Sequence, residues 1–190
     1  MTTVNMEQKS KMHPHKFTLW VAIGSIVMMF AGLTSAYIVK SNQTNWVPVK
    51  APMVFWLSTA VLVASSVTMQ LSLRAFKQRF LQQYRQLTGL TLVLGIVFVV
   101  LQWMGFQELW AQQVTFKGGG AGQFLYVIFG LHAIHVVGGV VALGTQFVRA
   151  FVGRTKVYSP VSVEVMSTYW HFVDLLWLYL LIFFIVVGQA

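Results

Sequence analysis

Five long apolar runs constrain what this chain can fold into. They cover residues 17–39, 53–73, 87–106, 124–148 and 166–187. A hydrocarbon core of roughly 30 Å needs about 20 helical residues, and each run supplies that length. Four runs contain no Asp, Glu, Lys or Arg, and the last contains one carboxylate, Asp174. Because a chain in lipid must satisfy its backbone hydrogen bonds within each segment, the sequence predicts an all-α membrane protein, a bundle of five transmembrane helices forming a single domain over residues 1–190.

The composition agrees with a membrane location. Only 9% of the 190 residues are charged and 57% are hydrophobic, whereas soluble domains carry about 25% charged residues. A net charge of +9 would suggest nucleic-acid binding in a soluble protein, but here the basic residues lie in short segments between apolar runs. We therefore expect no nucleic-acid partner. The absence of cysteine excludes a disulfide framework, a thiolate metal site and a cysteine nucleophile.

The basic residues are unevenly distributed between the two sides of the membrane. Ten of them fall on the side that holds the N-terminus: Lys9, Lys11, Lys16, Arg74, Lys77, Arg79, Arg85, Arg149, Arg154 and Lys156. The other side receives only Lys40, Lys50 and Lys117. Because cytoplasmic loops are enriched in Lys and Arg, this bias predicts a cytoplasmic N-terminus and a periplasmic C-terminus. The first run is too long for a signal-peptide core, so we interpret it as a retained helix that follows a polar cytoplasmic tail, residues 1–16.

Six tryptophans fall near the expected ends of the spans. They are Trp20, Trp46, Trp56, Trp103, Trp110 and Trp170. An indole ring at a membrane end can keep its N–H in water while its body stays in hydrocarbon. The sequence therefore predicts an ordinary aromatic belt at these positions.

The last two runs carry ionisable residues at membrane depth. Such residues are costly there, so each is expected to have a polar partner or a functional role. On the fourth, His132 and His135 are three residues apart and share one helix face. On the fifth, His171 and Asp174 have the same spacing. Glu164 lies ten residues before Asp174, close to three full turns, so Glu164, His171 and Asp174 are able to share a stripe.

Three interpretations of these residues stay open. Paired histidines and carboxylates are suitable ligands for a non-haem iron or zinc centre. They would also form a proton relay if water reached them. The favoured interpretation is a structural network in which Asp174 pairs with His135 or His171 and fixes the register of the last two helices. The chain has five histidines, of which His13 and His15 lie in the polar tail, and the remaining three are too few to ligate haem and copper.

Two segments carry a resemblance to a known family. The stretch from Glu164 to Leu180, which contains YWHFVDLLWL at residues 169–178, resembles the C-terminal signature of subunit III of cytochrome c oxidase and its quinol-oxidase relatives. Residues 130–138, GLHAIHVVG, are similar to the matching segment on that family's preceding helix. Weaker similarity extends through residues 52–78 and the Leu101–Gln102 pair. The order and separation of the two segments make this resemblance specific.

The resemblance implies a non-catalytic core subunit of a respiratory haem-copper oxidase in the bacterial inner membrane. Its helices would lie against subunit I, with subunit II and further respiratory-complex subunits nearby, and haem and copper would reside in the catalytic partner. Family members hold phospholipids and support proton uptake and the durability of subunit I. Carried over to this sequence, a buried polar network would comprise His132, His135, Glu164, His171 and Asp174, with Trp170 and Trp177 packed beside it.

Two departures from the family pattern limit this transfer. Mitochondrial members have seven helices, and this chain resembles them from their third helix onward, as some five-helix bacterial members do. Many members also carry an acidic residue in the helix that corresponds to residues 17–39, where this chain has Ser25 and Ile26. We expect cytochrome c as the electron donor of the complex. A quinol-oxidase subunit III and a membrane metalloenzyme built on the histidines and carboxylates are the alternatives.

Overall fold

The computed structural model describes residues 14–41, 52–111, 120–152 and 160–187. These residues form five long helices, and the described part of the chain contains no strand. The helices are α1 (Pro14–Ser41), α2 (Val54–Lys77), α3 (Leu81–Ala111), α4 (Gly120–Val152) and α5 (Pro160–Val187). Each contains a stretch long and apolar enough to cross a membrane. The predicted all-α fold with five spanning helices is confirmed.

The helices extend beyond the apolar runs from which they were predicted. The largest differences are at the start of α3, which begins at Leu81, and of α5, which begins at Pro160. An apolar run marks the thickness of the hydrocarbon, whereas helical hydrogen bonding continues into the polar interface. Proline suits the first helical position because its missing N–H would have no partner there, and α1 also begins at a proline, Pro14. The end of the predicted tail is therefore helical, and residues 1–13 lie outside the described residues.

A tight turn joins α2 to α3 as an antiparallel hairpin. Arg79 adopts a positive φ of 63°. The Phe80 N–H donates to the Ala75 carbonyl and the Arg79 N–H to the Phe76 carbonyl, each at 3.0 Å. These two bonds form a Schellman motif, which satisfies carbonyls left open at the end of a helix and reverses the chain direction.

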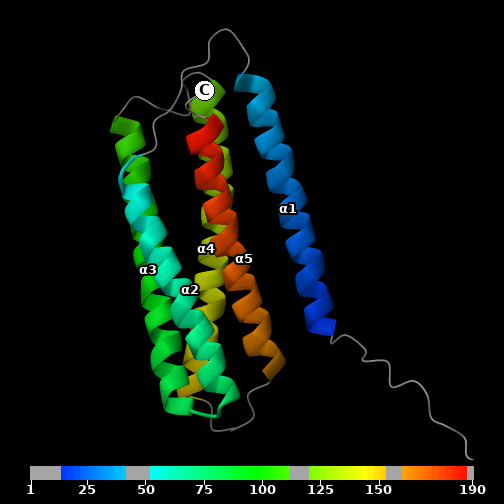
Figure 1. Cartoon of the computed structure of the whole chain (residues 1–190), viewed down its shortest axis with the longest axis vertical. Coiled ribbons are helices and arrows are strands. Elements are labelled where there is room, and N and C mark those ends of the chain that lie inside the picture. The colour runs from blue at the N-terminus through cyan, green and yellow to red at the C-terminus, as the bar shows by residue number, and fades with distance from the viewer. Residues whose placement is uncertain (1–13, 42–51, 112–119, 153–159, 188–190) are drawn as a thin grey trace, which may run out of the picture.

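The first helix stands apart from this hairpin. α1 packs against α4 and α5, while no close backbone approach joins it to α2 or α3 within the described ranges. Figure 1 shows α1 on one side of α5 and the α2–α3 hairpin on the other. One face of α5 is consequently left between α1 and α2.

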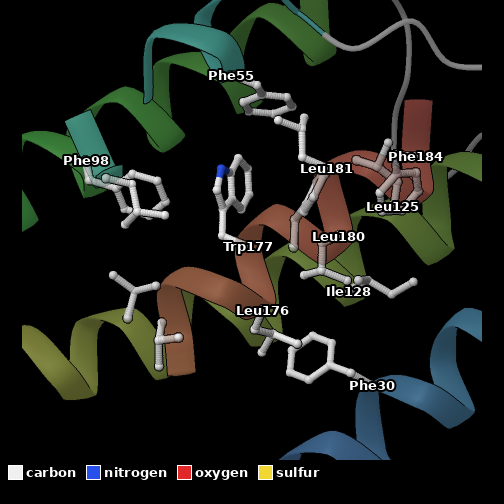
Figure 2. Close-up of a cluster of buried hydrophobic side chains, with 14 of the residues drawn as sticks. Phe30, Phe55, Phe98, Leu125, Ile128, Leu176, Trp177, Leu180, Leu181 and Phe184 are labelled. Atoms are coloured by element: carbon white, nitrogen blue, oxygen red, sulfur yellow. The ribbon is translucent and has the colours of Figure 1, made fainter. Parts of the chain in front are cut away.

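Aromatic side chains fill the centre of the bundle around Trp177, which is fully buried. Phe55 and Phe98 pack edge-on to its indole, with ring centroids 5.6 and 5.5 Å away. Figure 2 shows Trp177 projecting from α5 between these two rings. Gly105 of α3 makes room for the cluster, because a Cβ there would collide with the Phe55 ring. Lipid tails are as apolar as this core, so close packing rather than a hydrophobic driving force holds these helices together.

Candidate functional site

The structure divides the predicted polar network into three separate groups. Glu164 lies near the start of α5, where the N-terminal end of α1 and the C-terminal end of α2 meet it. His171 and Asp174 lie further along α5 and face α2. His132 and His135 lie on α4 among aromatic rings. Each group has its own chemistry.

Glu164 is the centre of an ion-pair cluster at one end of the bundle. Its Oε2 lies 2.8 Å from Lys16 Nζ, and its Oε1 lies 3.3 Å from Lys77 Nζ. The Glu164 side chain is 31% exposed, so it is not part of a buried network as the sequence had suggested. Exposed ion pairs contribute about 0–1 kcal/mol each. The cluster therefore links three helices without supplying much of their stability.

His171 is held by helix α2 through both ring nitrogens. Its Nδ1 lies 2.7 Å from Ser66 Oγ, and its Nε2 lies 3.3 Å from Gln70 Oε1. The Ser66 hydroxyl is also within hydrogen-bonding reach of the Asp174 carboxyl. The partners of His171 were missed in the sequence because serine and glutamine do not interrupt an apolar run.

Asp174 is buried, with 6% of its surface exposed. Its Oδ2 atom has no hydrogen-bond partner among the described residues. It lines a narrow apolar gap with Val136 and Gly139 of α4. The hydrogen bonds and ion pairs of the described residues do not join Asp174 to His135 or His171, so the expected pairing is not seen. The partner within reach is Ser66 of α2 instead.

The two histidines of α4 occupy aromatic surroundings. The His132 ring is 1% exposed, lies 5.3 Å from the Trp177 ring centroid, and has no hydrogen-bond partner among the described residues at either nitrogen. His135 Nδ1 lies 2.7 Å from the Leu131 carbonyl oxygen, where its N–H donates within the same helix. The His135 ring also faces Phe30 of α1 at 6.0 Å. Although the two rings share a helix face, neither makes a hydrogen bond or ion pair with a carboxylate in the part of the chain that the structure describes.

Trp170 and Trp177 both anchor α5 to α2 by their indole N–H groups. Trp170 Nε1 donates to Ser65 Oγ at 2.9 Å, and Trp177 Nε1 donates to Thr59 Oγ1 at 3.0 Å. Trp170 is only 2% exposed, so its expected place in an aromatic belt was wrong. An indole N–H buried in the bundle requires an acceptor, and a hydroxyl on the facing helix supplies one.

Serines spaced seven residues apart on α2 form a face that sequence reasoning overlooked. Ser58 accepts a hydrogen bond from Gln102 at 3.2 Å, and Ser72 lies 2.8 Å from the Thr88 hydroxyl. Ser65, between them, accepts from Trp170. All three serines are buried. A seven-residue repeat keeps side chains on one helix face, so this spacing is the signal that could have identified α2 as the polar partner of both α3 and α5.

These groups do not provide a metal ligand set. Within the described ranges, no three His, Asp or Glu side chains come together in a way that could hold a metal ion. Glu164 belongs to the membrane-end cluster, and His171 uses both nitrogens toward α2. The geometry instead ties helices together through hydroxyl, indole and imidazole groups.

Comparison with known proteins identifies the family of this chain. The family described as cytochrome c oxidase subunit III matches residues 7–189. A probable cytochrome c oxidase subunit 3 of Nocardia farcinica is 32% identical over 169 residues, covering 83% of each chain. The probable cytochrome c oxidase subunit 3 of Mycobacterium tuberculosis is 30% identical over 189 residues, covering 93% of each chain. The cytochrome c oxidase subunit 3 of Bacillus sp. PS3 is 26% identical over 85% of this chain and 80% of its own length. This chain therefore belongs to the cytochrome c oxidase subunit III family.

Proposed function

We propose that this chain is a non-catalytic core subunit of a bacterial cytochrome c oxidase and packs against the haem-copper subunit I. The observation that carries the proposal is the family match over residues 7–189, which includes all five helices. The relatives named above are cytochrome c oxidase subunits, which supports cytochrome c rather than quinol as the electron donor. Haem and copper would belong to the partner, and subunit II and further respiratory subunits would complete the assembly.

The chain would contribute a rigid, lipid-embedded scaffold to this complex. Support comes from the hydrogen bonds that join α2 to α5 through Ser65, Ser66 and Thr59. Interhelical hydrogen bonds in membranes average about 0.6 kcal/mol each, so several together are needed to fix the register of two helices. A bundle held in this way would stabilise subunit I during turnover, bind phospholipid at its outer surface and support proton uptake.

The bundle would lie in the bacterial inner membrane with its N-terminus in the cytoplasm. The uneven distribution of Lys and Arg supports this orientation. It places the Lys16–Glu164–Lys77 cluster at the cytoplasmic end of the spans and the end of α5 at the periplasmic side.

Affinity purification from membranes in mild detergent tests the proposal. A tag on this chain should co-purify a polypeptide that shows haem bands in the reduced-minus-oxidised spectrum and consumes oxygen with reduced cytochrome c. Membranes that carry an untagged chain, treated in the same way, provide the control. Purification of the chain alone, with stoichiometric iron or zinc and its own oxygen-consuming turnover, would contradict the proposal and favour a metalloenzyme.

A further inference from the structure

The turn between α2 and α3 forms a basic tip at one end of the bundle. Residues 74–83, which we call the hairpin tip, include Arg74, Lys77 and Arg79 but no Asp or Glu. Arg79 is exposed, and its neighbour Phe80 has 55% of its surface accessible. Figure 1 shows this turn at one extreme of the bundle, where α2 ends and α3 begins. The tip therefore presents positive charge and an aromatic ring together.

Arg79 holds a backbone conformation that costs free energy. Its φ of 63° lies in the left-handed region, and it is the only non-glycine residue with a positive φ among the described residues. A glycine would adopt this conformation without steric cost, because it has no Cβ. The turn is closed by backbone hydrogen bonds, and the Arg79 side chain makes no hydrogen bond or ion pair within the described ranges. Strain of this kind points to a function, and the group that glycine would lack is the guanidinium.

The chain has few carboxylates with which to neutralise the tip. It contains four in all: Glu7, Glu108, Glu164 and Asp174. Glu164 already pairs with two lysines, and Asp174 is buried inside the bundle. Glu108 lies 27 residues after the start of α3, about 40 Å along the helix, and Glu7 is outside the described residues. Charge complementarity to Arg79 is therefore to be sought on another molecule.

The position and composition of the tip favour a protein partner over a lipid headgroup. α2 ends four residues after Leu73, the last residue of its apolar run, so the turn begins about 6 Å beyond the hydrocarbon. At that height Phe80 lies at the outer edge of the headgroup layer, away from acyl chains. Arginine and aromatic side chains are enriched at protein interfaces and supply many of their strongest contacts.

We propose that the hairpin tip is a docking surface for an acidic segment of a neighbouring protein subunit. A carboxylate of that segment accepts paired hydrogen bonds from the Arg79 guanidinium, whose planar fork matches the two carboxylate oxygens. An apolar side chain of the same segment covers Phe80. The inference rests on the multi-subunit assembly of the proposed function, to which it adds a contact and the chemistry of the partner.

Arg79→Gly separates a docking role from a structural one. The purified complex carries a fluorescent label on this chain, and release of the chain is followed after dilution into excess unlabelled chain. We expect release to be about fivefold faster in Arg79→Gly. The melting temperature of the variant chain alone should rise by about 2–4 °C, because glycine relieves the strain. Arg149→Gln removes an exposed cation from the same end of the bundle, outside the tip, and should leave release unchanged.

Phe80→Gln tests the apolar half of the contact. It should also speed release without lowering the melting temperature of the chain, because the Phe80 ring is largely exposed. As salt is raised, the effect of Arg79→Gly should shrink, since screening weakens an exposed charge pair, while the effect of Phe80→Gln should persist. A photo-crosslinking residue at position 80 should capture a peptide of a co-purified subunit that contains Asp or Glu.

Several results would overturn the inference. They are unchanged release in Arg79→Gly, an equal acceleration in Arg149→Gln, a lower melting temperature of the Arg79→Gly chain, and a crosslink from position 80 to lipid alone. The haem spectrum keeps the inference distinct from the proposed function. A haem-containing partner whose release ignores Arg79 and Phe80 would refute the docking surface alone. A partner that depends on both residues but contains no haem, in a preparation free of haem proteins, would refute the proposed function and leave the docking surface standing.

Discussion

The first helix and the remaining four are similarly apolar in sequence, yet they differ in how much of their surface is buried in the bundle. Only 11% of the residues in the most apolar stretch of α1 are buried, against 44% in α5. α5 is held by indole, imidazole and hydroxyl groups that meet α2 along its length. The polar contacts of α1 with its neighbours include Thr34 Oγ1, which lies 3.0 Å from the Tyr179 hydroxyl, and the ion pair of Lys16 with Glu164. In a membrane, hydrophobicity places a helix in the bilayer, while small polar residues and close packing decide which helices join.

Replacement of one tryptophan in each region should give the largest difference in unfolding free energy between α5 and α1. Trp177→Ala leaves a cavity among Phe55, Phe98 and Phe129 and removes the hydrogen bond to Thr59. We expect a loss of about 3–5 kcal/mol in unfolding free energy, by analogy with core Phe and Trp truncations.

The matched variant Trp20→Ala in α1 should cost under about 0.5 kcal/mol, as exposed substitutions usually do, because Trp20 is 58% exposed. Denaturant titration of the chain in mixed micelles measures both changes. Equal losses would show that α1 is anchored as firmly as α5.

Replacement of a glycine by leucine tests how closely the helices pack in the two regions. A side chain at Gly105 collides with the buried Phe55 ring, so Gly105→Leu should destabilise the bundle by about 1–3 kcal/mol. Gly32 of α1 has no atom within 4 Å of a Cβ built there, so Gly32→Leu should have little effect on unfolding. Melting temperatures in detergent compare the two variants, and a larger drop for Gly32→Leu would reverse the contrast.

Removal of a serine hydroxyl should give a smaller effect. Ser65→Ala leaves the buried Trp170 N–H without its acceptor and should cost about 0.6 kcal/mol, and at most about 1.7 kcal/mol. Ser25→Ala in α1 removes an exposed hydroxyl that bonds only within its own helix, to the Val21 carbonyl, and should be neutral. The double variant Ser65→Ala/Trp170→Phe should lose little beyond Trp170→Phe alone, because the hydrogen bond is already absent. Additive losses would contradict a direct coupling.

The ion-pair cluster should contribute least. Glu164→Gln weakens the contacts with Lys16 and Lys77 and should reduce stability by under about 1 kcal/mol. Because these groups are partly exposed and the Debye length falls to about 3 Å at 1 M salt, the difference from the unsubstituted chain should shrink as salt is raised. Unfolding measured at low and high salt checks this. A loss that is independent of salt would indicate a buried contact instead.

The fold could be predicted from the sequence because charge-free runs of spanning length leave few alternatives to membrane helices. The sequence also shows which residues of α4 and α5 are polar, but it does not show which residues they contact. Asp174 was expected to pair with His135 or His171, whereas the hydrogen bonds of His171 run to Ser66 and Gln70. Hydropathy does not distinguish an exposed serine from a buried acceptor, and only the tertiary structure shows which helix faces which.

Glu164 also has a partner that its position in the sequence does not reveal. It was expected to share a stripe of α5 with His171 and Asp174, and both Glu164 and His171 contact α2. The spacing does not reveal that Lys16, distant by 148 positions in the sequence, completes the cluster. Contacts between the first and last helices depend on how the whole bundle closes.

The separation of α1 from the α2–α3 hairpin also has a consequence for biosynthesis. Of the five helices, α1 is made before the other four, and within the described ranges its backbone approaches those of α4 and α5, the two made last. As the polypeptide leaves the ribosome, α2 and α3 are able to form their hairpin at once, whereas α1 meets its first partner among the five helices only when α4 follows. The docking of α1 therefore cannot precede the synthesis of α4.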